Sequence, residues 1–221
     1  MNLFAGIWLI MLEKLPVKKA TKKMGRLGES EILKLIQKAE KCGATAAAAI
    51  SAGDISVEPE LALFCTQKKC EGYGKSMHCP PFGMNPSAFK KLLSEFSDAV
   101  VFKIDASTKK LLGEEKAAEF MKLQTISAQL ESFARREGFR RARAFAGGSC
   151  KEIFCSDRPC SGLSDSKSCR YEEIARASMS GLGINVFKLV EKAGWEMRKV
   201  TGEGDSEAEP VGTLAGLVLI C

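Results

Sequence analysis

The clearest alternation of secondary structure in the chain lies in AVVFKIDASTKKLLGEEKAAEFMKLQTISAQLESFARREGFRRARAFAGG, residues 99–148. The apolar run at 99–104 predicts a buried strand. Apolar residues recur at helical spacing from 114 to 137, which predicts a long helix that ends at Gly138. The stretch 141–145 then predicts a second strand. One strand, a crossing helix and another strand indicate helices packed on a sheet.

The segments on either side continue this alternation. A strand-and-helix pattern over most of 221 residues predicts an α/β (or α+β) fold, with one domain and a mixed sheet covered by helices. The other expected elements are a helix from Ser30 to Cys42, a strand or helix at 44–50, a strand at 61–64, a helix after Asn85-Pro86, helices over 174–182 and 186–193, and strands at 195–200 and 213–220.

The N-terminal segment differs in composition from the rest of the chain. Residues 1–12 are apolar, but they are too few for a transmembrane helix, which needs about 20 residues. The basic run at 13–26 follows the apolar run, whereas a signal peptide would have it first. We therefore expect a flexible lead-in at 1–28, a folded domain at 29–221, no membrane span and a cytoplasmic location.

Several common functions lack their sequence signatures. Most of the net charge of +6 comes from the basic run at 13–26, so the domain itself is nearly neutral and no nucleic-acid binding is expected. Neither a GxxxxGK[ST] nor a GxGxxG phosphate loop is present. The single histidine, His78, stands beside a cysteine, which argues against a Ser-His-Asp site.

Cysteine spacing is the strongest functional signal. The chain has nine cysteines, and seven of them fall in two short windows. In a chain without a convincing secretion signal, such windows indicate metal or redox sites before disulfides. The first window is Cys65-x4-Cys70-x8-Cys79, followed by two prolines, and the second is Cys150-x4-Cys155-x4-Cys160-x8-Cys169.

The two windows differ in the number of ligands they offer. The second supplies four thiolates, which is a complete set for an iron–sulfur cluster or for tetrahedral zinc. The first supplies three, so its fourth ligand stays open. The candidates are His78, Cys42, Cys221, a cysteine of the other window, or an exogenous ligand at an open position.

The cysteine spacing also bears on which metal is bound. Structural zinc often uses cysteine pairs separated by two residues, and neither window has such a pair. A four-residue gap also occurs in plant-type iron–sulfur proteins. The spacing therefore favours an iron–sulfur cluster, with a 4Fe–4S cluster first and zinc as the alternative. Thiols that cycle through disulfides are a third interpretation.

Two segments resemble a prokaryotic family of unknown function that is described as predicted metal-binding proteins. The first is CTQKKCEGYGKSMHCPP, at 65–81, and the second runs from GGSC, at 147–150, to CRYEEIARASMSGLGINVFKLVEKAGW, at 169–195. The similarity covers roughly residues 30–221. It implies metal binding by the matching cysteines, and it implies no particular reaction. Those cysteines are Cys65, Cys70, Cys79, Cys150, Cys155, Cys160 and Cys169.

These observations predict an iron–sulfur protein that transfers electrons or serves as a redox component. A zinc-stabilised binding module without redox chemistry is the alternative, and a thiol–disulfide redox protein is the second alternative. A redox partner protein is a possible partner. Whether the protein is an enzyme, and what its oligomeric state is, the sequence does not indicate.

Overall fold

The computed structural model describes residues 27–66, 70–164, 168–197 and 211–221. One four-stranded sheet lies at its centre, in the order β1-β2-β4-β3. The strands are β1 (Ala46–Ser51), β2 (Asp98–Ser107), β3 (Arg143–Ala146) and β4 (Val211–Ile220). Each neighbouring pair is antiparallel. The single α/β domain is confirmed, but the sheet is antiparallel and not mixed.

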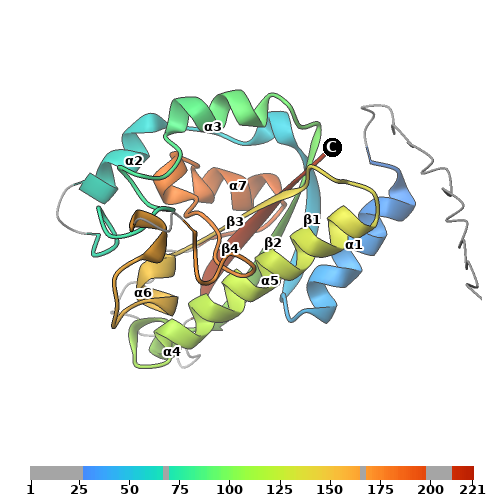
Figure 1. The fold of residues 1–221 in the computed structure, drawn as a ribbon. Coiled ribbons are helices and arrows are strands. Elements are labelled where there is room, and N and C mark those ends of the chain that lie inside the picture. The colour runs from blue at the N-terminus through green and yellow to red at the C-terminus, as the bar shows by residue number, and fades with distance from the viewer. Residues whose placement is uncertain (1–26, 67–69, 165–167, 198–210) are drawn as a thin grey trace, which may run out of the picture.

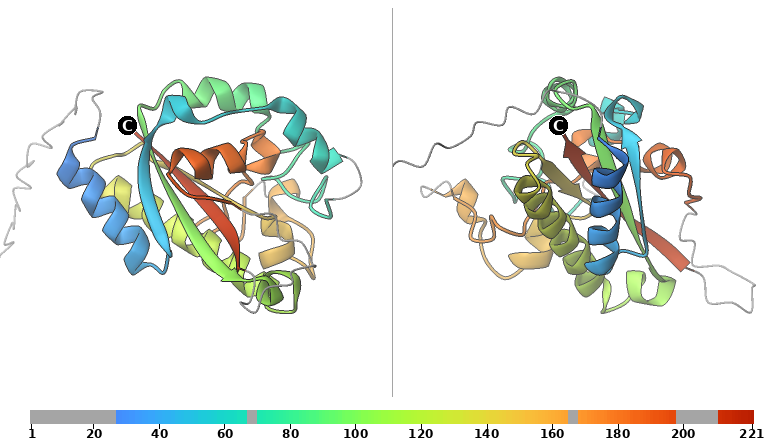
Figure 2. Two further views of the ribbon diagram at one scale, coloured as in Figure 1. Left: turned by 180° about the vertical axis from the view of Figure 1, so that it is seen from behind. Right: turned by 90° about the vertical axis from the view of Figure 1, so that its right-hand side faces the viewer.

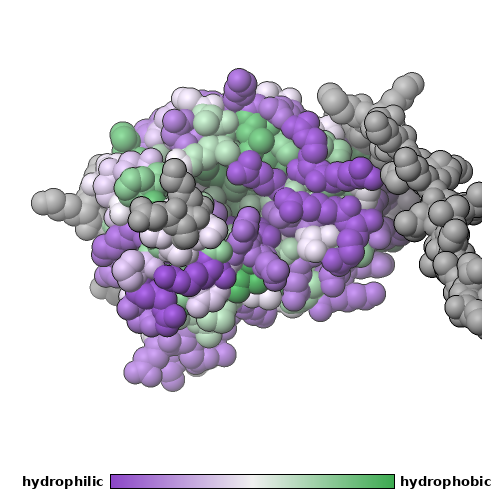
Figure 3. Space-filling view, viewed as in Figure 1, coloured by the Kyte–Doolittle hydropathy of each residue, from purple (hydrophilic) through white to green (hydrophobic). Residues whose placement is uncertain are grey.

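Two helices cover one face of the sheet. α1 (Glu29–Lys41) and α5 (Lys116–Arg136) lie side by side across it (Figures 1 and 2). Their apolar side chains pack on the residues of β2 and β4 that point the same way, such as Phe102 and Val218. The outward surface along α5 is mostly hydrophilic (Figure 3).

The opposite face carries shorter elements. Here α3 (Pro86–Leu93), α7 (Val186–Lys192) and the 3-10 turns η1 (Ala52–Asp54) and η3 (Ser180–Leu182) pack on the sheet. The sheet is therefore buried on both sides, which explains why its two long central strands read as nearly continuous apolar runs. The remaining elements are α2 (Pro59–Thr66), α4 (Thr108–Leu112), α6 (Cys150–Phe154) and η2 (Ser161–Leu163).

Most expected elements are present, with small shifts at their ends. The ambiguous 44–50 segment forms strand β1, and the helix expected after Asn85 begins at Pro86 with the Asn85 side chain accepting from Ala88 N–H. The first helix is capped by Gly28 and not by Ser30.

Two expectations are wrong. The apolar stretch 61–64, expected as a strand, lies inside helix α2. No α-helix forms over 174–182, where the structure has turns and the three-residue η3.

Parts of other expectations fall outside the described residues. These are positions 1–26 of the lead-in and 198–200 of the strand expected at 195–200. Residues 195–197 are not in a strand. Within the described ranges, no helix is long and apolar enough to cross a lipid bilayer.

Candidate metal centre

The first group of thiols, Cys65, Cys70 and Cys79, gathers beside the N-terminal end of α5. Cys65 lies in the last turn of α2, and the other two lie in the turns that follow. All three line one cavity of about 450 Å³, together with Tyr73 and Lys116. The first window thus brings its three cysteines together, as the spacing predicts, and they face an open space.

The second group begins where strand β3 ends. Gly147 and Gly148 carry the chain from β3 to Cys150, the first residue of α6. Gly148 has a φ of +77°, and a Cβ there would meet the ring of Phe120, so glycine is required at this bend.

The thiols of the second group surround a small space, and two of them, Cys150 and Cys155, are buried. Their side chains surround a cavity of only about 10 Å³, closed by Ser76, Phe154 and Tyr171. Phe154 and Tyr171 stack with their ring centroids 5.3 Å apart. The four cysteines that line this cavity are Cys150, Cys155, Cys160 and Cys169.

The two groups are in direct contact. The Ser76 hydroxyl lies 3.2 Å from the Cys150 sulfur, and the Ser149 hydroxyl lies 3.5 Å from the Cys79 sulfur. A Cβ on Gly72 would collide with the side chain of Ser149. Each loop therefore supplies a hydroxyl to a sulfur of the other, and the two windows form one cysteine-rich unit.

Burial keeps several of these thiols protonated in the metal-free protein. Cys65, Cys79, Cys150 and Cys155 are at most 9% exposed. Loss of hydration raises the pKa of Cys65 to about 11, with the neighbouring Cys70 and Cys79 adding to the shift. Burial likewise raises the pKa of Cys150 to about 12, although its contact with Ser76 opposes this.

The donor set selects among metals. Thiols are soft ligands that suit iron–sulfur clusters and zinc, whereas magnesium and calcium prefer oxygen. The Tyr171 N–H also donates to the Cys169 sulfur over 3.4 Å, a type of contact that tunes metal–thiolate centres. In the described parts of the chain, no three Cys, His, Asp or Glu side chains already form the tight grouping of a bound metal ion. The thiols instead line shared spaces.

Three proposed fourth ligands do not complete the first group. Cys42 caps α1 and packs on the α1/α5 face. Cys221 follows β4 at the end of the sheet opposite the cysteine loops and packs on the other face. Neither lines either cysteine cavity. His78 lines a different cavity, where burial and the charges of Arg176 and Arg143 lower its pKa.

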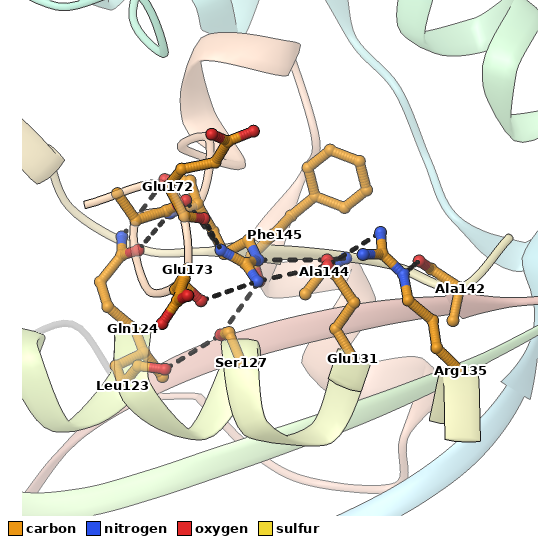
Figure 4. A network of polar contacts seen from close by, with 12 residues as sticks. Leu123, Gln124, Ser127, Glu131, Arg135, Ala142, Ala144, Phe145, Glu172 and Glu173 are labelled. Atoms are coloured by element: carbon orange, nitrogen blue, oxygen red, sulfur yellow. Dashed lines mark hydrogen bonds and ion pairs between the residues drawn. The ribbon is translucent and has the colours of Figure 1, made fainter. Parts of the chain in front are cut away.

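A buried polar network holds the chain that follows the second window. The Glu131 carboxylate, on α5, accepts from Ala144 N–H at 2.6 Å and from the Arg176 guanidinium at 3.1 Å (Figure 4). The Gln124 side chain accepts from Arg176 N–H at 2.6 Å. Residues 172–179 are thereby fixed to α5 and to the free edge of β3.

Sequence reasoning missed the polar members of this site. Ser76 and Ser149 contact cysteines that are 74 and 70 residues away, so no local pattern reveals them. Their positions beside Cys79 and Cys150 were the only available signal. Glu131 looked like an ordinary surface residue of an amphipathic helix.

Comparison with known proteins places the chain in a family. The model of one family, described as predicted metal-binding protein (DUF2284), matches residues 48–220. Comparison with curated proteins and with solved structures gave no match. The matched residues include both cysteine windows and all four strands except the first two residues of β1. The chain therefore belongs to the DUF2284 family of predicted metal-binding proteins.

Proposed function

We propose that this protein is an iron–sulfur protein that transfers electrons within a redox system. Cys150, Cys155, Cys160 and Cys169 would hold a four-thiolate centre, and the first group would hold a three-thiolate centre. The observation that carries the proposal is the convergence of seven thiols, from windows about 70 residues apart, on two adjoining spaces. Core packing alone does not require so many thiols in two contacting groups.

The chain's own residues suit the two centres to different tasks. The second group packs closely around a small space beside Phe154 and Tyr171, which leaves little room for a substrate and favours electron transfer without ligand exchange. The first group faces the cavity of about 450 Å³, where Tyr73, Lys116 and Glu152 offer polar groups to a small molecule. A bound cluster would supply reversible one-electron chemistry at these positions.

The contacts between the groups bear on this function. Hydroxyl and backbone N–H groups directed at sulfur stabilise the reduced, more negative state of a cluster and so raise its reduction potential. Ser76 and Ser149 occupy this role, one for each group. All nine cysteines are free thiols, as a reducing compartment would keep them, and this supports a cytoplasmic location.

One observation favours the zinc alternative for the second group. Its enclosed space of about 10 Å³ is small, and a single ion needs less room than a four-iron cluster. A tetrahedral zinc would draw the four sulfurs to within about 3.8 Å of one another, given Zn–S bonds of about 2.3 Å. The two proposals differ in colour, metal content and redox activity.

The test is anaerobic purification of the full chain, followed by absorbance spectroscopy and analysis of iron, sulfide and zinc. We expect broad absorbance at about 400 nm, equal molar amounts of iron and sulfide, and loss of this absorbance on reduction by dithionite. Cys150→Ser and Cys160→Ser remove ligands from the second group, and Cys70→Ser from the first. Cys42→Ser and Cys221→Ser are matched controls, because these cysteines lie outside both groups.

The variants test which cysteines hold the metal. Each ligand variant should lose about half of the iron, whereas both controls should keep all of it. Stoichiometric zinc without colour would replace this proposal with the zinc-stabilised module. Metal-free protein whose thiols oxidise in pairs would favour the thiol–disulfide alternative.

A further inference from the structure

A large cavity lies outside both thiol groups. It has a volume of about 1140 Å³ and opens between α5, α3, the start of β3 and the segment 172–177. Four arginines and one histidine line it: Arg135, Arg141, Arg143, Arg176 and His78.

The charges in the cavity do not balance. Arg135 and Arg176 both pair with the single carboxylate of Glu131, which leaves one positive charge in excess. Among the described residues, no carboxylate lies within ion-pair distance of Arg143, whose guanidinium stands 5.8 Å from the ring of Phe145.

The remaining charges lie at the edge of the cavity. Arg141 pairs with Glu95, so these two cancel. The side chains of Glu172 and Glu173 are exposed at the rim, while their backbone carbonyls accept from Arg176. Arg135, Arg141 and Arg143 are exposed, whereas the buried Glu131 and the largely buried Arg176 neutralise each other, so the excess positive charge lies at the mouth of the cavity. Such an arrangement attracts an anion to the mouth and gives it a charged hydrogen-bond partner there.

His78 supplies a second, independent observation. Its Nε2 atom is buried and has no hydrogen-bond partner among the described residues. A buried polar atom without a partner is costly, and in native proteins such an atom is normally satisfied by a water or a ligand. Arg143 and Arg176 are the two guanidiniums whose charge reaches this ring.

We propose that this cavity binds the carboxylate or phosphate group of a small molecule, held by Arg143, with a hydroxyl of the same molecule paired to His78 Nε2. A planar guanidinium matches the geometry of either oxyanion. Since His78 directly precedes Cys79, the bound molecule would lie beside the first thiol group. The site does not depend on whether the metal is iron or zinc.

The test is isothermal titration of the metal-loaded full chain with citrate and, separately, with inorganic phosphate, at constant ionic strength. We expect saturable binding of at least one of these anions in the micromolar to millimolar range. Arg143→Met should weaken it at least tenfold. Arg140→Met is the matched control, because Arg140 is an exposed arginine nearby that does not line the cavity, and it should bind like the wild type.

Two further measurements test the roles of Arg143 and His78 directly. Arg143→Lys keeps the charge but loses the planar fork, so it should bind with intermediate strength. As the only histidine of the chain, His78 gives a single set of ring ¹⁵N signals, which should shift on titration of the wild type but not of Arg143→Met.

The same variant distinguishes anion binding in this cavity from metal binding by the cysteines. Metal content and absorbance should be the same in Arg143→Met as in the wild type, since Arg143 touches no cysteine cavity. Binding of citrate alone would indicate a carboxylate ligand, and binding of phosphate alone a phosphorylated one. Equal losses in Arg143→Met and Arg140→Met, or no saturable binding of either anion, would overturn the proposal.

Discussion

Glu131 is a charged residue in the interior, with a side chain only 5% exposed. Its carboxylate is tolerated there because two guanidiniums and the Ala144 N–H surround it. It also occupies the free edge of strand β3, so a side chain takes the hydrogen bond that another strand would otherwise make. One residue thus protects the edge of the sheet and fixes the segment that follows the second thiol group.

Replacement of this residue should therefore be costly. Glu131→Gln leaves the largely buried guanidinium of Arg176 without its counter-charge, so the free energy of unfolding should fall by about 3 kcal/mol. Urea denaturation at neutral pH measures it. Glu137→Gln, which breaks a surface pair with Lys34, is the control and should cost about 1 kcal/mol or less. Equal effects would show that the Glu131 network is not a buried ion pair in solution.

Gly148 offers a second prediction. Both Gly148 and Gly138 have a positive φ, but only at Gly148 would a Cβ stand 2.5 Å from the Phe120 ring. Gly148→Ala should therefore destabilise the protein by roughly 1–3 kcal/mol more than Gly138→Ala, which meets nothing within 4 Å. Chemical denaturation of the two variants side by side gives this difference. Similar values would mean that Phe120 moves aside freely.

The sequence singled out candidate residues most readily where the residue type is rare. Cysteines at short spacing stand out, and all seven now lie in two groups. Serines and glutamates are common, and the importance of Ser76, Ser149 and Glu131 depends on partners that only folding brings near. Sequence patterns could not show those contacts.

At the scale of secondary-structure elements, Glu58 joins two segments far apart in sequence. Its carboxylate accepts from Ser56, from Asn185 at the N-cap of α7, and from Lys188, and these three bonds lower its pKa. A lowered pKa means that the ionised form stabilises the folded state. The stabilisation is present above the pH at which an unfolded glutamate titrates, and it is lost as the pH falls through the lower folded value.

Glu58→Gln should accordingly lower the melting temperature at neutral pH. The difference from the wild type should shrink as the pH falls below about 4, where the wild-type carboxyl also becomes neutral. Thermal melts across this pH range measure it, with Glu60→Gln, an exposed neighbour, as the reference. A difference that is constant with pH would rule out an electrostatic origin.

The incorrect predictions at this scale have identifiable causes. The run LALF at 61–64 is too short for its periodicity to separate strand from helix, and Pro59 at the helix start favours the helix. The segment 174–182 has helical spacing, but its backbone pairs elsewhere. Ala146 N–H donates to the Ala177 carbonyl, and Met179 N–H donates to the Ala146 carbonyl. Tertiary pairing with the edge of β3 replaced the helical bonds.

For the whole molecule, the two hydrophobic clusters on either side of the sheet contain none of the seven cysteines. The core is complete without metal, unlike that of a zinc finger. Protein stripped of metal under reducing conditions should therefore keep its far-UV circular dichroism and a cooperative thermal transition. Hydrogen exchange should become faster mainly in the cysteine loops at 70–79 and 150–175, and remain slow in β2 and β4. Loss of the cooperative transition would contradict this.

The fold class was predictable from alternating apolar segments, but strand direction was not. The long connections between strands fit parallel and antiparallel sheets alike. Which applies depends on the end of the sheet to which each connection returns, and no local sequence pattern encodes that.

The strand order has one more consequence. β4 follows every other described element in the chain, yet it lies between β2 and β3 in the sheet. Until β4 has been synthesised, β3 has no neighbouring strand. The segment that carries the second cysteine loop is therefore not yet fixed to the sheet. The sheet is complete only when β4 has emerged from the ribosome. Metal insertion into the second group is therefore expected to follow the synthesis of β4.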